Sequence, residues 1–228
     1  LSLISILFVN AHPATIKQDI DWPQFMSQQD MIWEKLPEYW YDSAFLGNGK
    51  LGLMIYKEPG KNYLRLETGN CDVHDHRTKR DVFGIPRLLT GHFALHPKGK
   101  IINGTIHLDL WNAEASTDIT TTKGVIHLRS FVHADEMMII VKATTEGDEH
   151  DFQWEWIAAE ANSPRYLIFK RQGKANKIPK DYELNPTAKI SNGKEINLSV
   201  QKLLAGGETS VGWQETYNPE TERNLWIN

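Results

Sequence analysis

Alternating hydrophobic and polar residues are the clearest pattern in the chain. In residues 105–111 every second residue is Ile or Leu, and residues 125–133 alternate in the same way. A period of two is typical of a strand with one buried face. Residues 137–141, Met-Met-Ile-Ile-Val, are apolar on both faces and predict a central strand. With residues 112–123 as a polar connection, these segments predict a three-stranded antiparallel meander.

Further strand patterns cover most of the chain. Two apolar segments flank the turn-forming residues 58–61, Glu-Pro-Gly-Lys, and predict a hairpin. Short spacing and frequent Gly, Asn and Pro between strands predict an all-β fold, a large antiparallel sandwich. Residues 172–195 are rich in Lys, Asn, Pro and Gly and are interpreted as a surface excursion. The segments that carry these strand patterns are 51–56, 63–67, 152–156, 166–169, 196–200 and 211–213.

One short helix is predicted near the N-terminus, over residues 22–36. Asp21 can cap it, and Pro23 suits a first helical turn. Phe25, Gln29, Ile32/Trp33 and Leu36 recur at helical spacing, and Pro37 follows the last of them.

The two ends of the chain suggest a piece of an exported protein. Residues 1–9 are uncharged and mostly apolar, and small residues follow, which is typical of a signal peptide. We therefore interpret residues 1–11 as a partial signal peptide and 12–228 as one domain; an N-terminal strand is the alternative. Export with a lone Cys71 favours a secreted or periplasmic bacterial protein. The apolar residues 225–227 suggest that the natural chain continues.

Composition excludes several classes of function. The 228 residues carry a formal net charge of −4, whereas a nucleic-acid-binding domain is usually strongly basic. No apolar stretch is long enough for a membrane-spanning helix. A single cysteine allows no intramolecular disulfide and no cysteine-rich zinc site. We find no nucleophile elbow and no phosphate-binding loop, and we expect no cofactor.

Residues 69–77 are the most function-like stretch. They include His74, Asp75, His76 and Arg77, whose side chains offer the donors and acceptors that sugar hydroxyls require. Three interpretations stay open: a sugar-binding rim, a structural loop, and a metal site built on His-x-His. His-x-His alone is a weak metal signal, so we predict no metal.

Tryptophan is abundant, with eight residues in the chain. Trp154, Trp156 and Trp213 lie in strand patterns and are expected in the core. Trp40 lies between two tyrosines and shortly before a glycine-rich turn, and is the candidate for a surface platform that stacks on sugars, with a core position as its alternative.

Ordered sequence blocks resemble a known family. Residues 45–56, Phe-Leu-Gly-Asn-Gly-Lys-Leu-Gly-Leu-Met-Ile-Tyr, resemble a conserved opening motif of glycoside hydrolase family 95 and its relatives. Residues 108–113, 124–134 and 135–141 resemble later blocks of that family in the same order. After Leu66 the sequence departs from the family pattern, which suggests a divergent branch.

The resemblance implies a function in glycoside hydrolysis and a separate catalytic domain. It implies an N-terminal β-super-sandwich that precedes a catalytic (α/α)₆ barrel in the natural chain, with the catalytic acid and base in the barrel and no catalytic residue here. It also implies a carbohydrate substrate, bound in a cleft that Trp40, Asn48 and residues 74–77 face. The chain alone would then be inactive. The alternative is a stand-alone carbohydrate-binding module.

Overall fold

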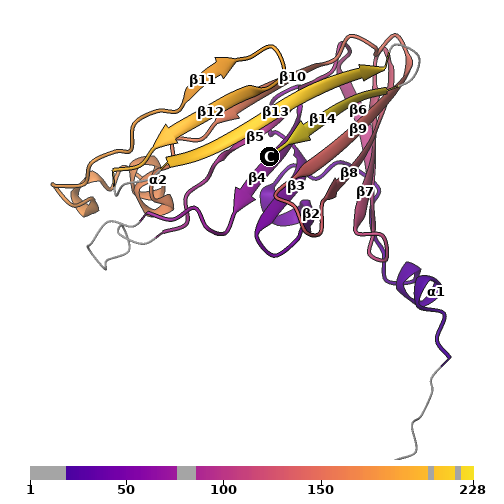
Figure 1. Ribbon diagram of the computed structural model, residues 1–228, viewed down its shortest axis with the longest axis horizontal. Coiled ribbons are helices and arrows are strands. Elements are labelled where there is room, and N and C mark those ends of the chain that lie inside the picture. The colour runs from indigo at the N-terminus through magenta and orange to yellow at the C-terminus, as the bar shows by residue number, and fades with distance from the viewer. Residues whose placement is uncertain (1–18, 76–85, 205–207, 219–221) are drawn as a thin grey trace, which may run out of the picture.

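The protein is an all-β sandwich of two antiparallel sheets (Figure 1). The computed structural model describes residues 19–75, 86–204, 208–218 and 222–228. The large sheet has nine strands in the order β1-β6-β7-β8-β9-β14-β13-β12-β11, and the small sheet has five, in the order β10-β5-β4-β3-β2. The fold class predicted from alternation is confirmed; residues 1–11, expected to be a signal peptide, lie outside the described residues.

The elements have the following bounds. The large sheet contains β1 (Met31–Trp33), β6 (Ile101–Asp109), β7 (Glu114–Thr121), β8 (Gly124–Val132), β9 (Ile139–Gly147), β11 (Lys189–Asn192), β12 (Asn197–Lys202), β13 (Glu208–Asn218) and β14 (Glu222–Ile227). The small sheet contains β2 (Ala44–Gly47), β3 (Leu51–Lys57), β4 (Leu64–Asn70), β5 (Gly91–His96) and β10 (Gln153–Ala158). The helical segments are α1 (Trp22–Ser27), α2 (Pro164–Arg171) and the 3-10 turns η1 (Trp40–Asp42) and η2 (Ala175–Lys177).

The predicted meander has one strand more than expected. The threonine-rich stretch taken as a connection contains β7, which pairs with both β6 and β8. Thr117 and Thr121 alternate with exposed residues and are buried. Threonine is β-branched and fits a sheet surface well, so a polar, threonine-rich stretch can form a strand and not a connection. The next strand begins only at Ile139, because Met138 forms a turn with Glu136.

The prediction of a helix over residues 22–36 is wrong in its extent. Asp21 caps α1 as expected, with its side chain accepting from the Gln24 amide, but the helix ends at Ser27. Residues 31–33 instead pair with β6 as an edge strand. Strand pairing therefore overrides the helical spacing of the apolar residues.

Residues 166–169 are helical, and their prediction as a strand is also wrong. The signals for α2 are local: Ser163 caps the helix by accepting from the Arg165 amide, and Pro164 starts it. Lys170 and Arg171 lie in the last turn, where positive charge stabilises a helix.

The core lies between the sheets, and tryptophans contribute to it as predicted. Trp156 and Trp213 are buried, and their rings pack against Phe93 at centroid distances of 4.8 and 5.6 Å. Trp154 packs against the same cluster from the edge. Burial of such side chains stabilises the fold by about 25 cal/mol per Å² of apolar surface.

The two sheets differ in width, so the large sheet extends past the small one. Near β6, Leu36 covers the overhang: a Cβ on Gly104 would lie 2.8 Å from its Cγ. Near β12, the overhanging part of the large sheet is covered by the connection between β10 and β11, residues 159–188, through polar contacts. There Gln201 donates to the Pro186 carbonyl at 2.7 Å, and Asn185 donates to the Ala161 carbonyl at 2.6 Å. Figure 1 shows α2, part of that connection, at the end of the molecule opposite α1.

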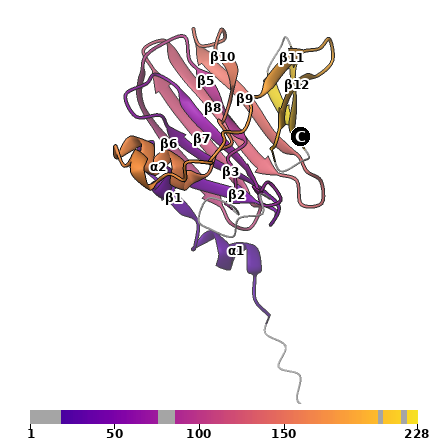
Figure 2. The ribbon, with the colours of Figure 1, turned by 90° about the vertical axis from the view of Figure 1, so that its left-hand side faces the viewer.

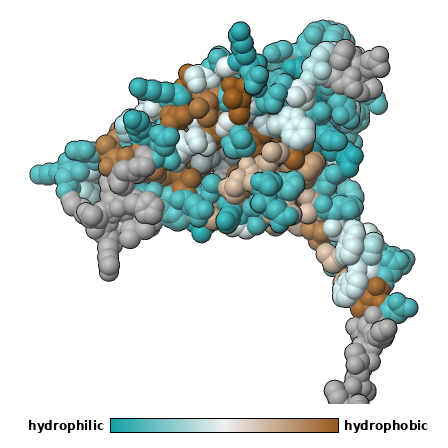
Figure 3. Space-filling model, in the orientation of Figure 1, coloured by the Kyte–Doolittle hydropathy of each residue, from teal (hydrophilic) through white to brown (hydrophobic). Residues whose placement is uncertain are grey.

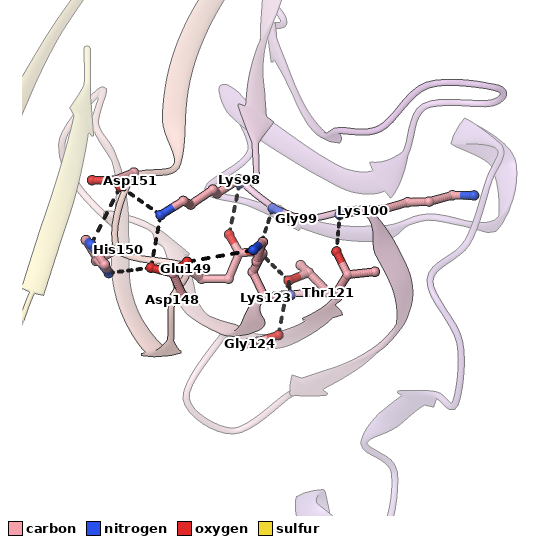
Figure 4. A network of polar contacts seen from close by, with 11 residues as sticks. Lys98, Gly99, Lys100, Thr121, Lys123, Gly124, Asp148, Glu149, His150 and Asp151 are labelled. Atoms are coloured by element: carbon pink, nitrogen blue, oxygen red, sulfur yellow. Dashed lines mark hydrogen bonds and ion pairs between the residues drawn. The ribbon is translucent and has the colours of Figure 1, made fainter.

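A buried carboxylate joins three connections at one end of the sandwich (Figure 4). Glu149 is fully buried and accepts from the amides of Lys98 and Gly99 at 2.9 and 2.7 Å, and from the Thr121 hydroxyl. A Cβ on Gly99 would lie 2.6 Å from the Glu149 carboxylate, so only glycine permits this approach. Asp151 pairs nearby with Lys98 at the surface.

We expect Glu149→Gln to lower the free energy of unfolding by about 2 kcal/mol, because an amide group cannot accept from all of these donors. Asp151→Asn is the matched control, and loss of its exposed ion pair with Lys98 should lower stability much less, because solvent screens such a pair. Thermal or urea unfolding measures both. Equal stability losses in the two variants would contradict the role assigned to Glu149.

Candidate functional site

Asn48 connects the two sheets at one end of the sandwich. It lies in the tight β2–β3 turn, where Gly49 has a φ of 89° that favours glycine. Its amide nitrogen donates to the carbonyls of His133 and Glu136 at 2.9 and 3.2 Å. Its amide oxygen accepts from the backbone of Lys50 and Leu51 at 3.0 and 2.8 Å. The amide predicted to bind sugar is thus engaged within the chain, between this turn and the β8–β9 turn.

The loop after β4 lies beside the Asn48 turn. The Cys71 amide donates to the Lys50 carbonyl at 2.8 Å, which joins the start of the loop to the turn. His74 forms a β-bridge with Arg87, and the Asp75 amide donates to the Pro86 carbonyl at 2.9 Å. The structure therefore joins the start of this loop, at Cys71, to the Asn48 turn, and it pairs His74 and Asp75 with residues 86–87.

The side chains of this loop differ in exposure. Asp75 is only 2% exposed, whereas His74 is half-buried. The other two predicted residues of the loop, His76 and Arg77, lie outside the described residues. Across the described part of the chain, no group of three or more His, Cys, Asp or Glu residues could hold a metal ion.

Trp40 lies at the other end of the small sheet. In the β2–β3 pairing Gly47 is opposite Gly52 near the Asn48 turn, whereas Ala44 is opposite Ile55. The η1 turn precedes Ala44, so the length of β2 separates Trp40 from Asn48. Trp40 is 64% exposed, as expected for a surface platform. The structure thus separates one predicted sugar-binding residue from the others.

Trp40 lines a groove of about 1780 Å³ at an open edge of the sandwich. The groove lies between β1, the edge of the large sheet, and β2, the edge of the small sheet, which Figure 2 shows on the same side of the molecule. Tyr39, Tyr41 and Phe45 also line it, and all three are exposed. Of these four groove residues, only Trp40 is a candidate from the sequence, although Tyr39 and Tyr41 directly flank it.

A polar cluster that no local sequence pattern predicts lies on the outer face of the small sheet. Tyr56 donates to Glu67 at 2.6 Å, and the Arg65 guanidinium lies 3.2 Å from the same carboxylate. His92, opposite Glu67 on β5, is only 7% exposed, and its Nε2 has no hydrogen-bond partner among the described residues. The alternation of side chains along β3, β4 and β5 places these residues on the outer face of the sheet. They come into contact because these three strands are neighbours in the sheet.

Burial and neighbouring charges change the pKa values of His92 and Tyr56 in this cluster. Burial, with a smaller effect from the positive charge of Arg65, lowers the pKa of His92 from 6.5 to about 4. Burial and the hydrogen bond to Glu67 raise the pKa of Tyr56 above its usual value. At neutral pH the histidine and tyrosine are therefore uncharged beside the ion pair of Arg65 and Glu67. This arrangement suits a structural cluster.

Comparisons with known proteins give a likeness of fold only. No protein-family model and no curated protein matches the chain. Among solved structures, the chain is similar to a protein from the human microbiome that is described as a kojibiose phosphorylase, with 11% identity and a TM-score of 0.45. The match covers 81% of this chain and 26% of that protein, so the chain spans about a quarter of its length. No described helix is both long and apolar enough to span a membrane.

We expect Asn48→Asp to lower the free energy of unfolding by about 2 kcal/mol, because a carboxylate would face two carbonyl oxygens in place of two donated hydrogen bonds. Asn192→Asp, at an exposed position of β11, adds the same charge and should have little effect. Urea unfolding compares the variants. Unchanged stability in Asn48→Asp would contradict the structural role of this amide.

We also expect stability to depend on pH through His92. Between pH 6.5 and about 4 the unfolded chain binds a proton that the folded protein excludes, so the free energy of unfolding falls as pH falls. The loss should reach about 3 kcal/mol, at about 1.4 kcal/mol per pH unit.

Replacing His92 by Gln should remove that part of the pH dependence, whereas His96→Gln, at a partly exposed position of the same strand, should keep it. Urea unfolding at several pH values tests this. An unchanged slope in His92→Gln would show that another group is responsible.

Proposed function

We propose that the chain is the N-terminal β-sandwich domain of an exported glycoside hydrolase, which shapes the sugar cleft without supplying the catalytic acid and base. The observation that carries the proposal is the position of the Asn48 turn. This turn and the loop with His74 are the two segments that the family resemblance assigns to the cleft. The hydrogen bond from the Cys71 amide to the Lys50 carbonyl, which joins the start of the loop to the turn, supports that assignment.

The residues at this end divide into supporting and contacting groups. Asn48 holds the β2–β3 turn in place. We assign the buried Asp75 a supporting role, in which it positions the loop after β4. The half-buried His74 offers an imidazole that can donate to or accept from a sugar hydroxyl. Loops held on a rigid sheet are a common way to build a binding site.

Hydrolysis of a glycosidic bond commonly needs two carboxyl groups about 5–9.5 Å apart, on either side of the bond. Two of the buried carboxylates in the described residues are engaged with the chain itself. Glu67 binds Tyr56 and Arg65, and Glu149 binds backbone amides. Following the family resemblance, the proposal assigns the acid and base to an (α/α)₆ barrel encoded after residue 228.

The proposal is tested by comparing the isolated chain with the full-length product of the gene. We expect hydrolysis of oligosaccharides only by the full-length protein. There His74→Ala should lower kcat/KM by about tenfold, the loss of one hydrogen bond to substrate, without changing the melting temperature.

The control is His150→Ala, at an exposed position in the β9–β10 connection, which should leave kcat/KM unchanged. Hydrolysis by the isolated chain would overturn the proposal. A reading frame without helical hairpins after residue 228 would do so as well.

A further inference from the structure

The groove at Trp40 is built from both sheets. Its lining includes β1 and β6 of the large sheet, β2 and β3 of the small sheet, and the chain that crosses between them. Two contacts fix this crossing segment. Trp33 of β1 donates from its indole to the Asp42 carbonyl at 2.8 Å, and the Lys57 amide of β3 donates to the Pro37 carbonyl at 2.8 Å.

The exposed rings sit on a rigid support. The Ser43 hydroxyl donates to the Trp40 carbonyl at 2.7 Å and closes the η1 turn. The rings of Tyr39 and Tyr41 are parallel, with centroids 5.2 Å apart, and Trp40 meets Tyr41 nearly at a right angle. Rings that are ordered before a ligand arrives lose little conformational entropy on binding.

The polar residues of the groove indicate the chemistry of its ligand. Its charged lining comprises Glu34, Lys35, Glu38, Asp42 and Lys57, three acidic and two basic side chains, with a formal net charge of −1. Glu38 and Lys57 pair with each other at 3.0 Å. This mixed lining forms no basic patch that would attract polyanions such as nucleic acids, and it offers both donors and acceptors to neutral hydroxyls.

The size of the groove indicates the length of the ligand. Pockets for single small molecules measure about 300–1,000 Å³, and this groove is larger, at about 1780 Å³. Aromatic faces with a few polar groups beside them suit the apolar C–H faces and the hydroxyls of a sugar chain.

We propose that this groove binds a segment of a neutral polysaccharide, with the Trp40 ring stacked on a sugar face. The site is separate from the loops around Asn48 and His74, and the inference does not depend on the proposed role in hydrolysis. A domain with both features would hold an insoluble or long substrate at one end of the small sheet while contributing to a cleft at the other.

The rival occupant of an apolar groove is another protein surface, such as a second copy of the chain. Elsewhere, on the face that Figure 3 shows, hydrophobic residues form separate patches among hydrophilic ones. At Trp40 the three consecutive aromatic residues 39–41 instead lie between the charged residues Glu38 and Asp42. Charged groups directly beside exposed rings suit the hydroxyls of a sugar ligand better than they suit the dry centre of a protein interface.

The test is binding of the isolated chain to soluble neutral polysaccharides, with xyloglucan, mixed-linkage β-glucan, galactomannan and amylose as probes. Affinity electrophoresis and calorimetry should detect binding to at least one probe, which tightens with oligosaccharide length. Trp40→Ala should weaken it by about tenfold, as for a central aromatic contact. Trp111→Ala is the matched control, because Trp111 is similarly exposed but does not line the groove, and it should leave binding unchanged.

Three results would overturn the inference. The first is no binding to any probe, and the second is an equal loss of polysaccharide affinity in Trp40→Ala and Trp111→Ala. The third is a dimer of the chain in sedimentation that Trp40→Ala converts to a monomer. Hydrolysis by the full-length protein is measured separately on short substrates, so failure of this inference leaves the proposed function intact, and the reverse also holds.

Discussion

The unequal width of the two sheets is the constraint on which the rest of the structure depends. Five strands cannot cover the inner face of nine, so other segments must exclude water from the overhanging strands. Near β6 this is done by the chain around Leu36, which crosses from one sheet to the other. Near β12 it is done by the connection that contains α2.

The two segments that cover the overhang differ in their exposed side chains, and this difference points to the groove at Trp40 as a candidate binding site. The α2 connection uses buried amides such as Asn185 and Gln201, which satisfy one another and the backbone. The crossing segment buries Leu36 but leaves its tyrosines and Trp40 in solvent. A segment that is anchored from both sides and still exposes aromatic rings is better explained by binding than by stability.

Much of the fold could be predicted from the sequence because strand alternation is a local signal. The hairpin of β3 and β4 and the core positions of Trp156 and Trp213 follow from it directly. Two predictions are wrong for different reasons. The apolar residues from Phe25 to Leu36 have helical spacing, but residues 31–33 pair with β6 as a strand. The threonines of β7 are polar, which indicates a connection, but they lie in a strand that pairs with β8.

The candidate sites were harder to predict, because they depend on which strands become neighbours. The sequence indicated Asn48, His74 and Trp40 as a group, but the β2–β3 register places Trp40 at the opposite end of the small sheet. The cluster of Tyr56, Arg65, Glu67 and His92 required the order β5-β4-β3, which no local pattern reveals.

Hydrogen–deuterium exchange of the chain, with and without a neutral polysaccharide, tests whether the proposed groove at Trp40 binds sugar chains. We expect slower exchange on binding, confined to residues 34–43 and 101–103. Protection that appears instead at the Asn48 turn, or is spread evenly over the sheets, would contradict it.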